Sequence, residues 1–372
     1  MNQKTAASEI WQEILPQYTF YRSAGKIEAI PYGNGHINDT FLITCAMNSD
    51  VPKRYILQRI NTSVFRDPDG LMENIFNVTS FLRKKISAAG GDPDRETITI
   101  IPNEQGGLYC RDKEGGCWRV YRYIDGAVTY QTAESEKDFR ESAVAFGRFR
   151  RLLEDYPAHT LHETIPHFHD TPDRYRQFIE ALERDIKNRA KGIQKEIEFV
   201  LSREADTHIL VDLLHAGELP LCVTHNDTKL NNVMLDEKTK KGLCVVDLDT
   251  VMPGLSLYDY GDSIRFGAST AAEDEQDLSK VEMDLRLYQA YTEGYLEAAG
   301  ESMTKKEIEM MPMGAKMMTL ECGIRFLTDY LSGDSYFKIH REGHNLDRAR
   351  TQFKLVADME RKWEKMTALL PV

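Results

Sequence analysis

The sequence has no long apolar run, and no stretch approaches the roughly 20 consecutive apolar residues of a membrane-spanning helix. Its first 15 residues mix charged with apolar side chains and lack the continuous apolar core of a signal peptide. Acidic residues outnumber basic ones and give a formal net charge of -12, whereas affinity for nucleic acid or anionic membranes needs clustered Lys and Arg. We therefore expect a cytoplasmic protein that binds neither nucleic acid nor membranes.

The six cysteines form no C-x-x-C pair and no spacing with histidine that is typical of a metal site. We expect them to be reduced thiols. Low-complexity tracts and repeats of 20 to 50 residues are absent as well, which excludes solenoids and propellers. No long apolar surface helix stands out, so a monomer is expected. The 372 residues exceed what one compact core usually takes and favour two lobes.

Residues 27–124 are rich in β-type runs, which lie at 41–43, 55–57, 98–100, 108–110 and 118–124. Turn residues separate them: Gly33-Asn34-Gly35 precedes the first run, and Glu114-Gly115-Gly116 predicts a hairpin between the last two. Between the second and third runs, apolar residues recur every three to four positions over 71–82 and predict a helix. This region therefore predicts an antiparallel sheet with one helix.

Helical periodicity takes over after Asp125-Gly126, first as a stripe from Phe139 to Leu153. A longer helix is expected after the capping pair Thr171-Pro172, with apolar positions that continue through Ile197. The second lobe is therefore predicted to be mostly helical. We place the lobes at 1–124 and 125–372.

The segment from Leu221 to Leu235, LCVTHNDTKLNNVML, places a polar loop between two apolar β-type runs. Its pattern His225-x-Asp227-x-x-x-x-Asn232 has the spacing of a kinase catalytic loop, in which Asp accepts the proton of the acceptor and Asn holds magnesium. Lys229 could reach the transferred phosphoryl group. The alternative is a polar hairpin whose side chains merely satisfy the turn.

The next apolar run ends in Asp247-Leu248-Asp249, where kinases keep a second metal-binding carboxylate. Oxygen ligands of this kind suit magnesium. Asp247 is the better candidate for joining the metal to the ATP phosphates, whereas Asp249 could take a second ion or only cap the following turn. Two successive matches in the correct order favour phosphoryl transfer over the hairpin alternative.

Together with Pro253-Gly254, Tyr258-Asp259 and Gly261-Asp262, these two segments resemble the aminoglycoside phosphotransferase (choline kinase-like) family. The resemblance implies an α+β, bilobal, protein-kinase-like fold, with an antiparallel sheet and a helix in the N-terminal lobe and a mostly helical C-terminal lobe. It implies that residues 1–124 bind ATP, the co-substrate, and that residues 125–372 carry catalysis and the acceptor.

Carried over residue by residue, the resemblance makes Asp227 the catalytic base or orienting carboxylate, with Lys229 beside it, and Asn232 and Asp247 the Mg²⁺ ligands. A loop from Gly33 to Asn38 would cover the phosphates, and backbone groups at the lobe junction would hold adenine. The residues expected to contact the nucleotide are Gly33, Gly35, Asn38, Gln58, Tyr121, Tyr123 and Ile124.

Several further runs are similar to bacterial members of the family that phosphorylate the anomeric hydroxyl of N-acetylhexosamines; they include PYGNGHINDTF, RYILQRINTSVF, VTHNDTKLNN and ECGIRFLTDYL. That similarity spans nearly the whole chain. It implies that N-acetylglucosamine (GlcNAc) or N-acetylgalactosamine (GalNAc) is converted to its 1-phosphate. The residues expected to contact the sugar are Asp227, Arg265, Phe266, Arg325 and Tyr336.

One position departs from the wider kinase pattern, because the strand Tyr55-Ile56-Leu57-Gln58-Arg59 has no Lys to pair with the phosphates. Gln58 is expected at that position. An amide brings no charge, so phosphate affinity must depend on magnesium, Lys229 or Arg59.

Other functions remain open at this point. His162, His167 and His169 cluster in LHETIPHFHD and could serve a metallohydrolase, although the prolines around them favour an ordinary loop. The missing Lys could indicate non-catalytic nucleotide binding, but Asp227, Asn232 and Asp247 together oppose it. Among kinases, an aminoglycoside, choline or another sugar could be the acceptor. Arg265 and Arg325 would repel amines, which favours a neutral sugar.

Overall fold

The computed structural model describes residues 11–33, 38–47, 51–130 and 135–371. Contacts between residues divide the chain into two compact units. The first unit comprises Met1–Ala127 with Cys244–Asp249, and the second comprises Val128–Leu243 with Thr250–Val372. The acidic segment that ends at Asp249 thus packs with the first unit although it follows the polar loop in the chain. The proposed roles of the lobes 1–124 and 125–372 stay predictions.

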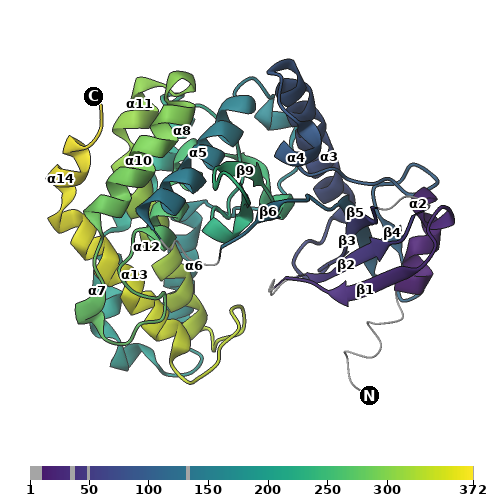
Figure 1. Cartoon of the computed structure of the whole chain (residues 1–372). Helices are drawn as coiled ribbons and strands as arrows, with labels where there is room; N and C mark the ends of the chain where they lie inside the picture. The colour runs from purple at the N-terminus through teal and green to yellow at the C-terminus, as the bar shows by residue number, and fades with distance from the viewer. Residues whose placement is uncertain (1–10, 34–37, 48–50, 131–134, 372) are drawn as a thin grey trace. The chain divides into compact units, whose positions relative to one another are not determined.

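The first unit is built on a five-stranded antiparallel sheet in the order β1-β2-β3-β5-β4 (Figure 1). One long helix and short helical segments accompany it (Figure 1). The elements are η1 (Leu15–Gln17), α2 (Thr19–Arg22), β1 (Ile27–Pro31), β2 (Asp39–Cys45), β3 (Lys53–Ile60), α3 (Pro68–Ala88), α4 (Pro93–Glu96), β4 (Cys110–Arg111) and β5 (Cys117–Arg122).

The alternation of side chains along the strands gives this sheet two different faces. On one face, Tyr55 and Leu57 of β3 join a buried cluster with Ile14, Leu15 and Tyr18 from the N-terminal helical segment. Residues at the intervening positions point to the other face, where polar side chains are found. A strand buried on both faces would instead read as a continuous apolar run.

Most sequence predictions for this unit are confirmed, including the helix at 71–82, which lies within α3, and the hairpin at Gly115, whose φ of 86° suits glycine. The predicted strand at 98–100 is wrong, because only Ile100 forms an isolated bridge, with Tyr121. Strand β1 was not among the predicted runs. Its side chains are mostly exposed, so it lacks a buried apolar face.

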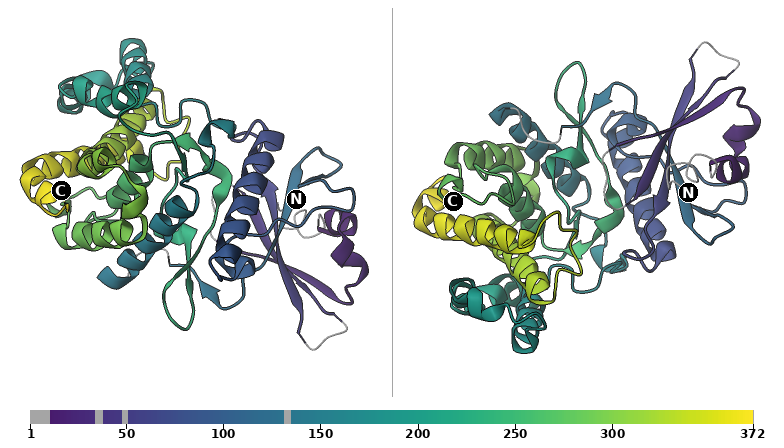
Figure 2. Two further views of the ribbon diagram at one scale, coloured as in Figure 1. Left: turned by 90° about the horizontal axis from the view of Figure 1, so that it is seen from above. Right: turned by 90° about the horizontal axis from the view of Figure 1, so that it is seen from below.

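The second unit is mostly helical, as expected (Figures 1 and 2). Helix α5 packs against α10, and α12 packs against α6, α9 and α13. The helices are α5 (Glu136–Leu152), α6 (Thr171–Arg184), α7 (Gln194–Leu201), α8 (Glu204–His215), α9 (Ser256–Gly267), α10 (Leu285–Ala299), α11 (Lys305–Glu309), α12 (Met311–Leu331), α13 (His344–Arg361) and α14 (Trp363–Ala368). Single 3₁₀ turns join them: η2 (Ala158–Thr160), η3 (Ala190–Gly192), η4 (Leu230–Asn232), η5 (Leu248–Thr250), η6 (Leu278–Lys280) and η7 (Gly300–Ser302).

The long helix predicted after Thr171-Pro172 is wrong in its length. Helix α6 ends at Arg184, because Asp185 adopts a left-handed conformation with φ 32°. Ile186 is exposed, and Ile197 belongs to the separate helix α7. The capping residue is Asp170, whose carboxylate accepts the backbone N–H of Asp173.

The remaining strands are short. Strand β7 (Cys222–Thr224) pairs with β10 (Met252–Gly254), and β6 (Ala127–Val128), β8 (Val233–Asp236) and β9 (Gly242–Val245) form a sheet in the order β6-β8-β9. The polar loop predicted from sequence lies between β7 and β8.

The structure bears on two expectations from the sequence, which concern membrane-spanning helices and the cysteines. In the part of the chain that the structure describes, no helix is both long enough and apolar enough to span a bilayer. All six cysteines lie among the described residues and are free thiols.

Helices α9 and α12 approach so closely that glycine is required at their contact. A Cβ atom on Gly261 would overlap with the carbonyl group of Gly314. We predict that Gly261→Ala lowers the free energy of unfolding by about 1–3 kcal/mol, because the two backbones must separate. Urea or thermal unfolding measures this change.

Gly300→Ala is the matched control. Its added Cβ would meet only Leu296 at 3.8 Å, and Gly300 already has helical φ and ψ of -55° and -37°. This variant should be neutral or stabilised by about 0.4–1 kcal/mol. Equal stability of the two variants would contradict the close contact at Gly261.

Candidate active site

The polar loop at residues 225–232 connects two buried strand ends of the second unit, Val223-Thr224 and Val233. The apolar strands fix both ends of the loop, so that its polar side chains keep a defined position. Asn226 has a φ of 64°, a left-handed conformation that asparagine tolerates better than most residues. Asp227 follows this turn.

Asp259, in the first turn of α9, binds the backbone of the loop. Its carboxylate oxygens accept the backbone N–H groups of His225 and Asn226 at 2.8 and 2.7 Å. Burial raises the pKa of Asp259, although His225 and the two backbone hydrogen bonds act against that shift. The buried Asp259 carboxylate therefore accepts hydrogen bonds from the backbone of the loop.

More hydrogen bonds tie the loop to the same helix. The Thr228 hydroxyl donates to the backbone oxygen of Asp259 at 2.6 Å, and the Ser263 hydroxyl donates to the backbone oxygen of Thr228 at 2.9 Å. The His225 ring lies edge-on to Phe146 and Phe149, with centroids 5.6 and 6.1 Å away. The loop is consequently fixed on both sides, by polar groups on α9 and by aromatic rings on α5.

Asp227 lies between two loop side chains. Its Oδ1 is 2.7 Å from Nζ of Lys229, and the Asn232 amide donates to its Oδ2 at 3.1 Å and to its backbone oxygen at 2.8 Å. The Asp227 side chain is 30% exposed. The loop thus brings together the three residues predicted from its spacing and leaves the carboxylate accessible.

Lys229 lies near a series of oppositely charged side chains. Burial alone would lower the pKa of Lys229, but Asp227 and Asp262 outweigh it and the pKa is raised. Asp262 accepts from Nε of Arg265 at 2.9 Å, and Arg265 donates to Glu273 at 2.8 Å through Nη1. Lys229 is therefore a cation at neutral pH, next to an Arg265 whose charge is already balanced.

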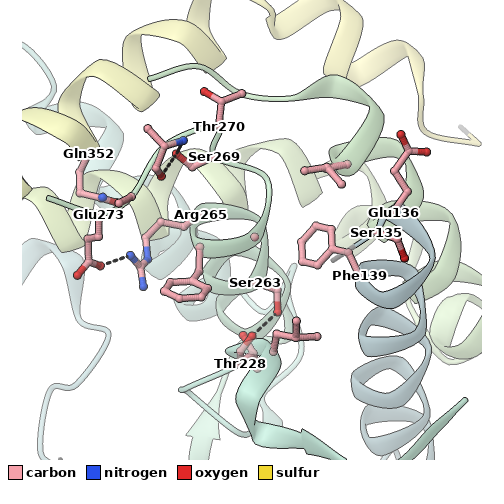
Figure 3. Close-up of a pocket in the computed structure, with 16 residues that line it drawn as sticks. Ser135, Glu136, Phe139, Thr228, Ser263, Arg265, Ser269, Thr270, Glu273 and Gln352 are labelled. Atoms are coloured by element: carbon pink, nitrogen blue, oxygen red, sulfur yellow. Dashed lines mark hydrogen bonds and ion pairs between the residues drawn. The ribbon is translucent and has the colours of Figure 1, made fainter. Parts of the chain in front are cut away.

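A cavity of about 610 Å³ lies in the second unit and borders this loop (Figure 3). Thr228 and Leu230 contribute to its wall, together with the predicted sugar residues Arg265 and Phe266. Hydroxyl and aromatic side chains also line it, namely those of Ser135, Phe139, Ser263, Ser269 and Thr270, together with Glu136, Glu273, Gln352, Leu287 and small residues. Such a mixture suits a small molecule with several hydroxyl groups.

The other three predicted sugar residues, Asp227, Arg325 and Tyr336, are not among the residues that line this cavity. The Arg325 guanidinium is over the rings of Phe168 and Phe337, at 5.1 and 5.7 Å from their centroids, and Tyr336 is 67% exposed. Burial, and then the charge of Arg325, lowers the pKa of Arg174. Arg174 and Arg325 are therefore two neighbouring cations.

Cys322 connects this region with the cavity. Burial raises the pKa of its thiol to about 11, and the charges of Arg265 and Arg325 both act on it in the opposite direction. The charges of both predicted acceptor arginines therefore act on the Cys322 thiol, although only Arg265 lines the cavity.

The residues predicted to contact the nucleotide lie in the first unit. Gly33 follows β1 with a φ of 76°, as a turn requires, and Gln58 lies on β3. Tyr121 is buried near the end of β5, and the Tyr123 ring carries the guanidinium of Arg54 at 4.5 Å. Ile124 is buried as well. The predicted Gly35 lies outside the described residues.

The two carboxylates of the acidic segment have different surroundings. Asp247 is exposed and has a φ of 60°, whereas Asp249 is buried and accepts the Asn38 amide at 2.7 Å. Asp249 also forms an ion pair with Arg119. Asp247 is therefore the more accessible of the two.

Two of the three histidines of the alternative metal site pair with carboxylates. His169 is buried, with Nδ1 2.8 Å from Oε1 of Glu321, and His167 contacts Asp170 at 3.1 Å. Among the residues that the structure describes, no group of three or more His, Cys, Asp or Glu side chains could hold a metal ion.

Comparisons with solved structures identify the class of fold. The chain is similar to a choline kinase from Cryptosporidium parvum (14% identity, TM-score 0.59, covering 99% of this chain and 98% of that one). It is similar to an aminoglycoside phosphotransferase from Alicyclobacillus acidocaldarius (11% identity, TM-score 0.58, covering 95% of this chain and 96% of that one). It also resembles an amicoumacin kinase in complex with AMP-PNP, Ca²⁺ and Ami (12% identity, TM-score 0.56, covering 95% of this chain and 96% of that one). The predicted α+β, kinase-like fold is confirmed.

Residues 28–296 match the profile of the phosphotransferase enzyme family, abbreviated APH. Because the match covers most of the chain, the protein belongs to this family of small-molecule kinases.

Two residues of the structure were given no role from the sequence. Asp259 was noticed only as part of a family motif, and its contact with the loop depends on chain folding over more than 30 residues. Arg119 interrupts the otherwise apolar stretch Trp118 to Tyr121, and this was the available signal. A charged residue inside a buried strand needs a partner.

We predict that Asp259→Asn loosens the loop, because an amide can accept only through its single oxygen and its NH₂ group would face a backbone donor. The free energy of unfolding should fall by about 1–3 kcal/mol. Hydrogen exchange of the peptide that covers residues 222–232 should become faster.

Asp236→Asn is the control, since its carboxylate also accepts two backbone N–H groups, from Lys238 and Thr239, but in an exposed turn. Its effect should stay within that turn. Unaltered exchange at residues 225–227 in Asp259→Asn would show that Asp259 does not hold the loop.

Proposed function

We propose that the protein transfers the γ-phosphate of ATP to the anomeric hydroxyl of an N-acetylhexosamine, GlcNAc or GalNAc, and releases the sugar 1-phosphate and ADP. The observation that carries this proposal is the accessible Asp227 carboxylate, placed between Lys229 and Asn232 on a loop whose backbone is fixed by Asp259. Phosphoryl transfer depends mainly on such positioning and on fixed charges.

In the proposed reaction, the anomeric oxygen forms a bond to the γ-phosphorus and the bond from that phosphorus to the β,γ-bridging oxygen breaks. ADP leaves with the electron pair of that bond. Asp227 orients the hydroxyl and takes its proton. Lys229 is held as a cation beside Asp227, where it can stabilise negative charge on the transferred group.

The residues present fit a magnesium ion. Since the Asn232 amide nitrogen donates to Asp227, its side-chain oxygen is the atom left for a cation. Asp247 supplies an exposed carboxylate. Both are hard oxygen ligands of the kind that Mg²⁺ binds. When bound, Mg²⁺ would neutralise charge on the nucleotide phosphates.

ATP as the donor is supported by family membership and by the amicoumacin kinase of similar fold that was solved with an ATP analogue. We assign the adenine to backbone groups of Tyr121–Ile124 and the phosphates to the segment from Gly33 to Asn38.

A neutral sugar is supported by unpaired positive charges in the second unit. Arg174 and Arg325 are adjacent cations, and within the described residues the Arg325 guanidinium makes no ion pair. These charges oppose an amine-bearing acceptor such as choline or an aminoglycoside. The cavity beside the loop offers hydroxyl and aromatic groups that suit a sugar. The choice of an N-acetylhexosamine rests on the sequence runs that resemble such kinases.

The first experiment measures ATP consumption with Mg²⁺ across GlcNAc, GalNAc, their 1-O-methyl glycosides, glucose, kanamycin and choline. We expect turnover of the free N-acetylhexosamines and none of the methyl glycosides, because methylation removes the reacting hydroxyl. Phosphorus NMR should detect a sugar 1-phosphate.

Turnover of kanamycin or choline in place of the sugars would replace the acceptor while leaving the kinase assignment intact. Phosphorylation of a methyl glycoside would exclude the anomeric position. An enzyme that consumes no ATP with any acceptor would contradict the proposed function.

We also predict that Asp227→Asn lowers kcat by about 10²–10⁴-fold, the range for losing a general base. The amide keeps the shape of the carboxylate, so nucleotide binding should persist in calorimetry. A variant that retains the wild-type kcat would remove Asp227 from this role.

A further inference from the structure

A buried arginine lies in the first unit and has no role in the proposed function so far. Arg119, on β5, is 1% exposed. Its Nη2 is 2.5 Å from Oδ1 of Asp249, and its Nη1 is 3.8 Å from the sulfur atom of Met72 on α3. Arg119 therefore occupies the face of the sheet opposite the cluster around Tyr55 and Leu57.

Gln58 holds this arginine from the neighbouring strand. Gln58 pairs with Arg119 in the register of β3 and β5, and with Thr40 in the register of β2 and β3. Its side-chain oxygen accepts Nε and Nη2 of Arg119 at 3.0 and 2.6 Å, while its NH₂ group donates to the Thr40 hydroxyl at 3.1 Å. The amide at the position of the usual kinase lysine is thus engaged within the sheet.

The cation stays charged in this environment. Burial would lower the pKa of Arg119, but Asp249 and, more weakly, Asp247 raise it, and the net shift is upward. A buried guanidinium is tolerated only when it is paired. Asp249 and Gln58 supply that pairing.

The ion pair of Arg119 involves Asp249, the second of the two acidic residues. Asp249, 3% exposed, is bound by Arg119 and by the Asn38 amide, so its charge and position are fixed. Asp247 is two residues earlier, exposed, and in a left-handed conformation. Such a conformation is less favourable for aspartate than a right-handed one and persists where neighbouring contacts enforce it.

We propose that Arg119, held by Gln58, is a positioning residue: by binding Asp249, it fixes the acidic segment and with it the position of Asp247, the proposed magnesium ligand. This inference rests on the proposed function, since it takes Asp247 as a magnesium ligand. Arg119 acts on Asp247 through Asp249.

The test measures binding of the ATP analogue AMP-PNP by calorimetry, once with EDTA and once with Mg²⁺, below the melting temperature of each variant. The ratio of the two affinities is the magnesium gain. Arg119→Lys keeps the charge but loses the fork that reaches Asp249 and Gln58 together. We expect the magnesium gain to fall about 10- to 100-fold, as for other residues that orient a metal ligand, with little change in EDTA.

Arg150→Lys is the matched control. Arg150 is also buried and paired, with Nη2 3.0 Å from Glu307 and Nη1 2.9 Å from Ser302, but it lies on α5 in the second unit. It should lose thermal stability as Arg119→Lys does and keep the full magnesium gain. Gln58→Met is a milder second variant that leaves Arg119 and Asp249 in place, and it should lower the gain in the same direction.

An unchanged magnesium gain in Arg119→Lys would overturn the inference; if that protein does not fold, an unchanged gain in Gln58→Met would do so. An equal loss of gain in Arg150→Lys would show that general destabilisation is the cause, and would also overturn it. Wild-type protein without any magnesium gain would remove the metal role of Asp247 and with it the proposed function, an outcome that needs no variant to recognise.

Discussion

The contact between the buried Asp259 carboxylate and two successive backbone N–H groups determines the geometry of the catalytic loop. A carboxylate is costly to bury, and burial raises its pKa, so the hydrogen bonds from His225 and Asn226 compensate for lost hydration. In return, the backbone just before Asp227 has little freedom. Asp259 itself is fixed because α9 packs on α12 through the close approach of Gly261 and Gly314. The position of Asp227 is therefore coupled to the helical core of the second unit.

The first unit uses the same principle with the charges exchanged. There a buried cation, Arg119, binds the carboxylate of Asp249, and the exposed Asp247 lies two residues away. In both units a buried charge fixes the backbone next to a carboxylate that is at least partly accessible, Asp227 in one and Asp247 in the other. Arginine suits this task better than lysine, because one planar guanidinium binds Gln58 and Asp249 simultaneously. The uncharged Gln58 then has a role of its own, because its side-chain oxygen accepts hydrogen bonds that orient the Arg119 guanidinium.

Local sequence patterns were sufficient for much of the fold and for the position of the loop. The spacing from His225 to Asn232 depends on neighbouring residues, and the structure brings Asp227, Lys229 and Asn232 together as that spacing predicts. Contacts between distant segments were not accessible in this way. Asp259 and the Gln58–Arg119 pair depend on which strands and helices become neighbours. The break at Asp185 was missed for a different reason, because apolar periodicity continues through Ile186 although that side chain is exposed.

The pairing of the carboxylates near the cavity bears on the class of acceptor. A site for an amine needs an anionic group that is not already neutralised. Here Asp262 and Glu273 are both bound to Arg265, and Glu321 accepts from Thr171 while it contacts His169. Glu136, at the cavity wall, is 3.7 Å from Arg286. These four carboxylates thus have partners within the protein, whereas Arg174 and Arg325 are neighbouring cations that make no ion pair within the described residues. This pattern of charges is the electrostatic basis of our proposal that the acceptor is uncharged, because a polyamine would have to compete with internal ion pairs.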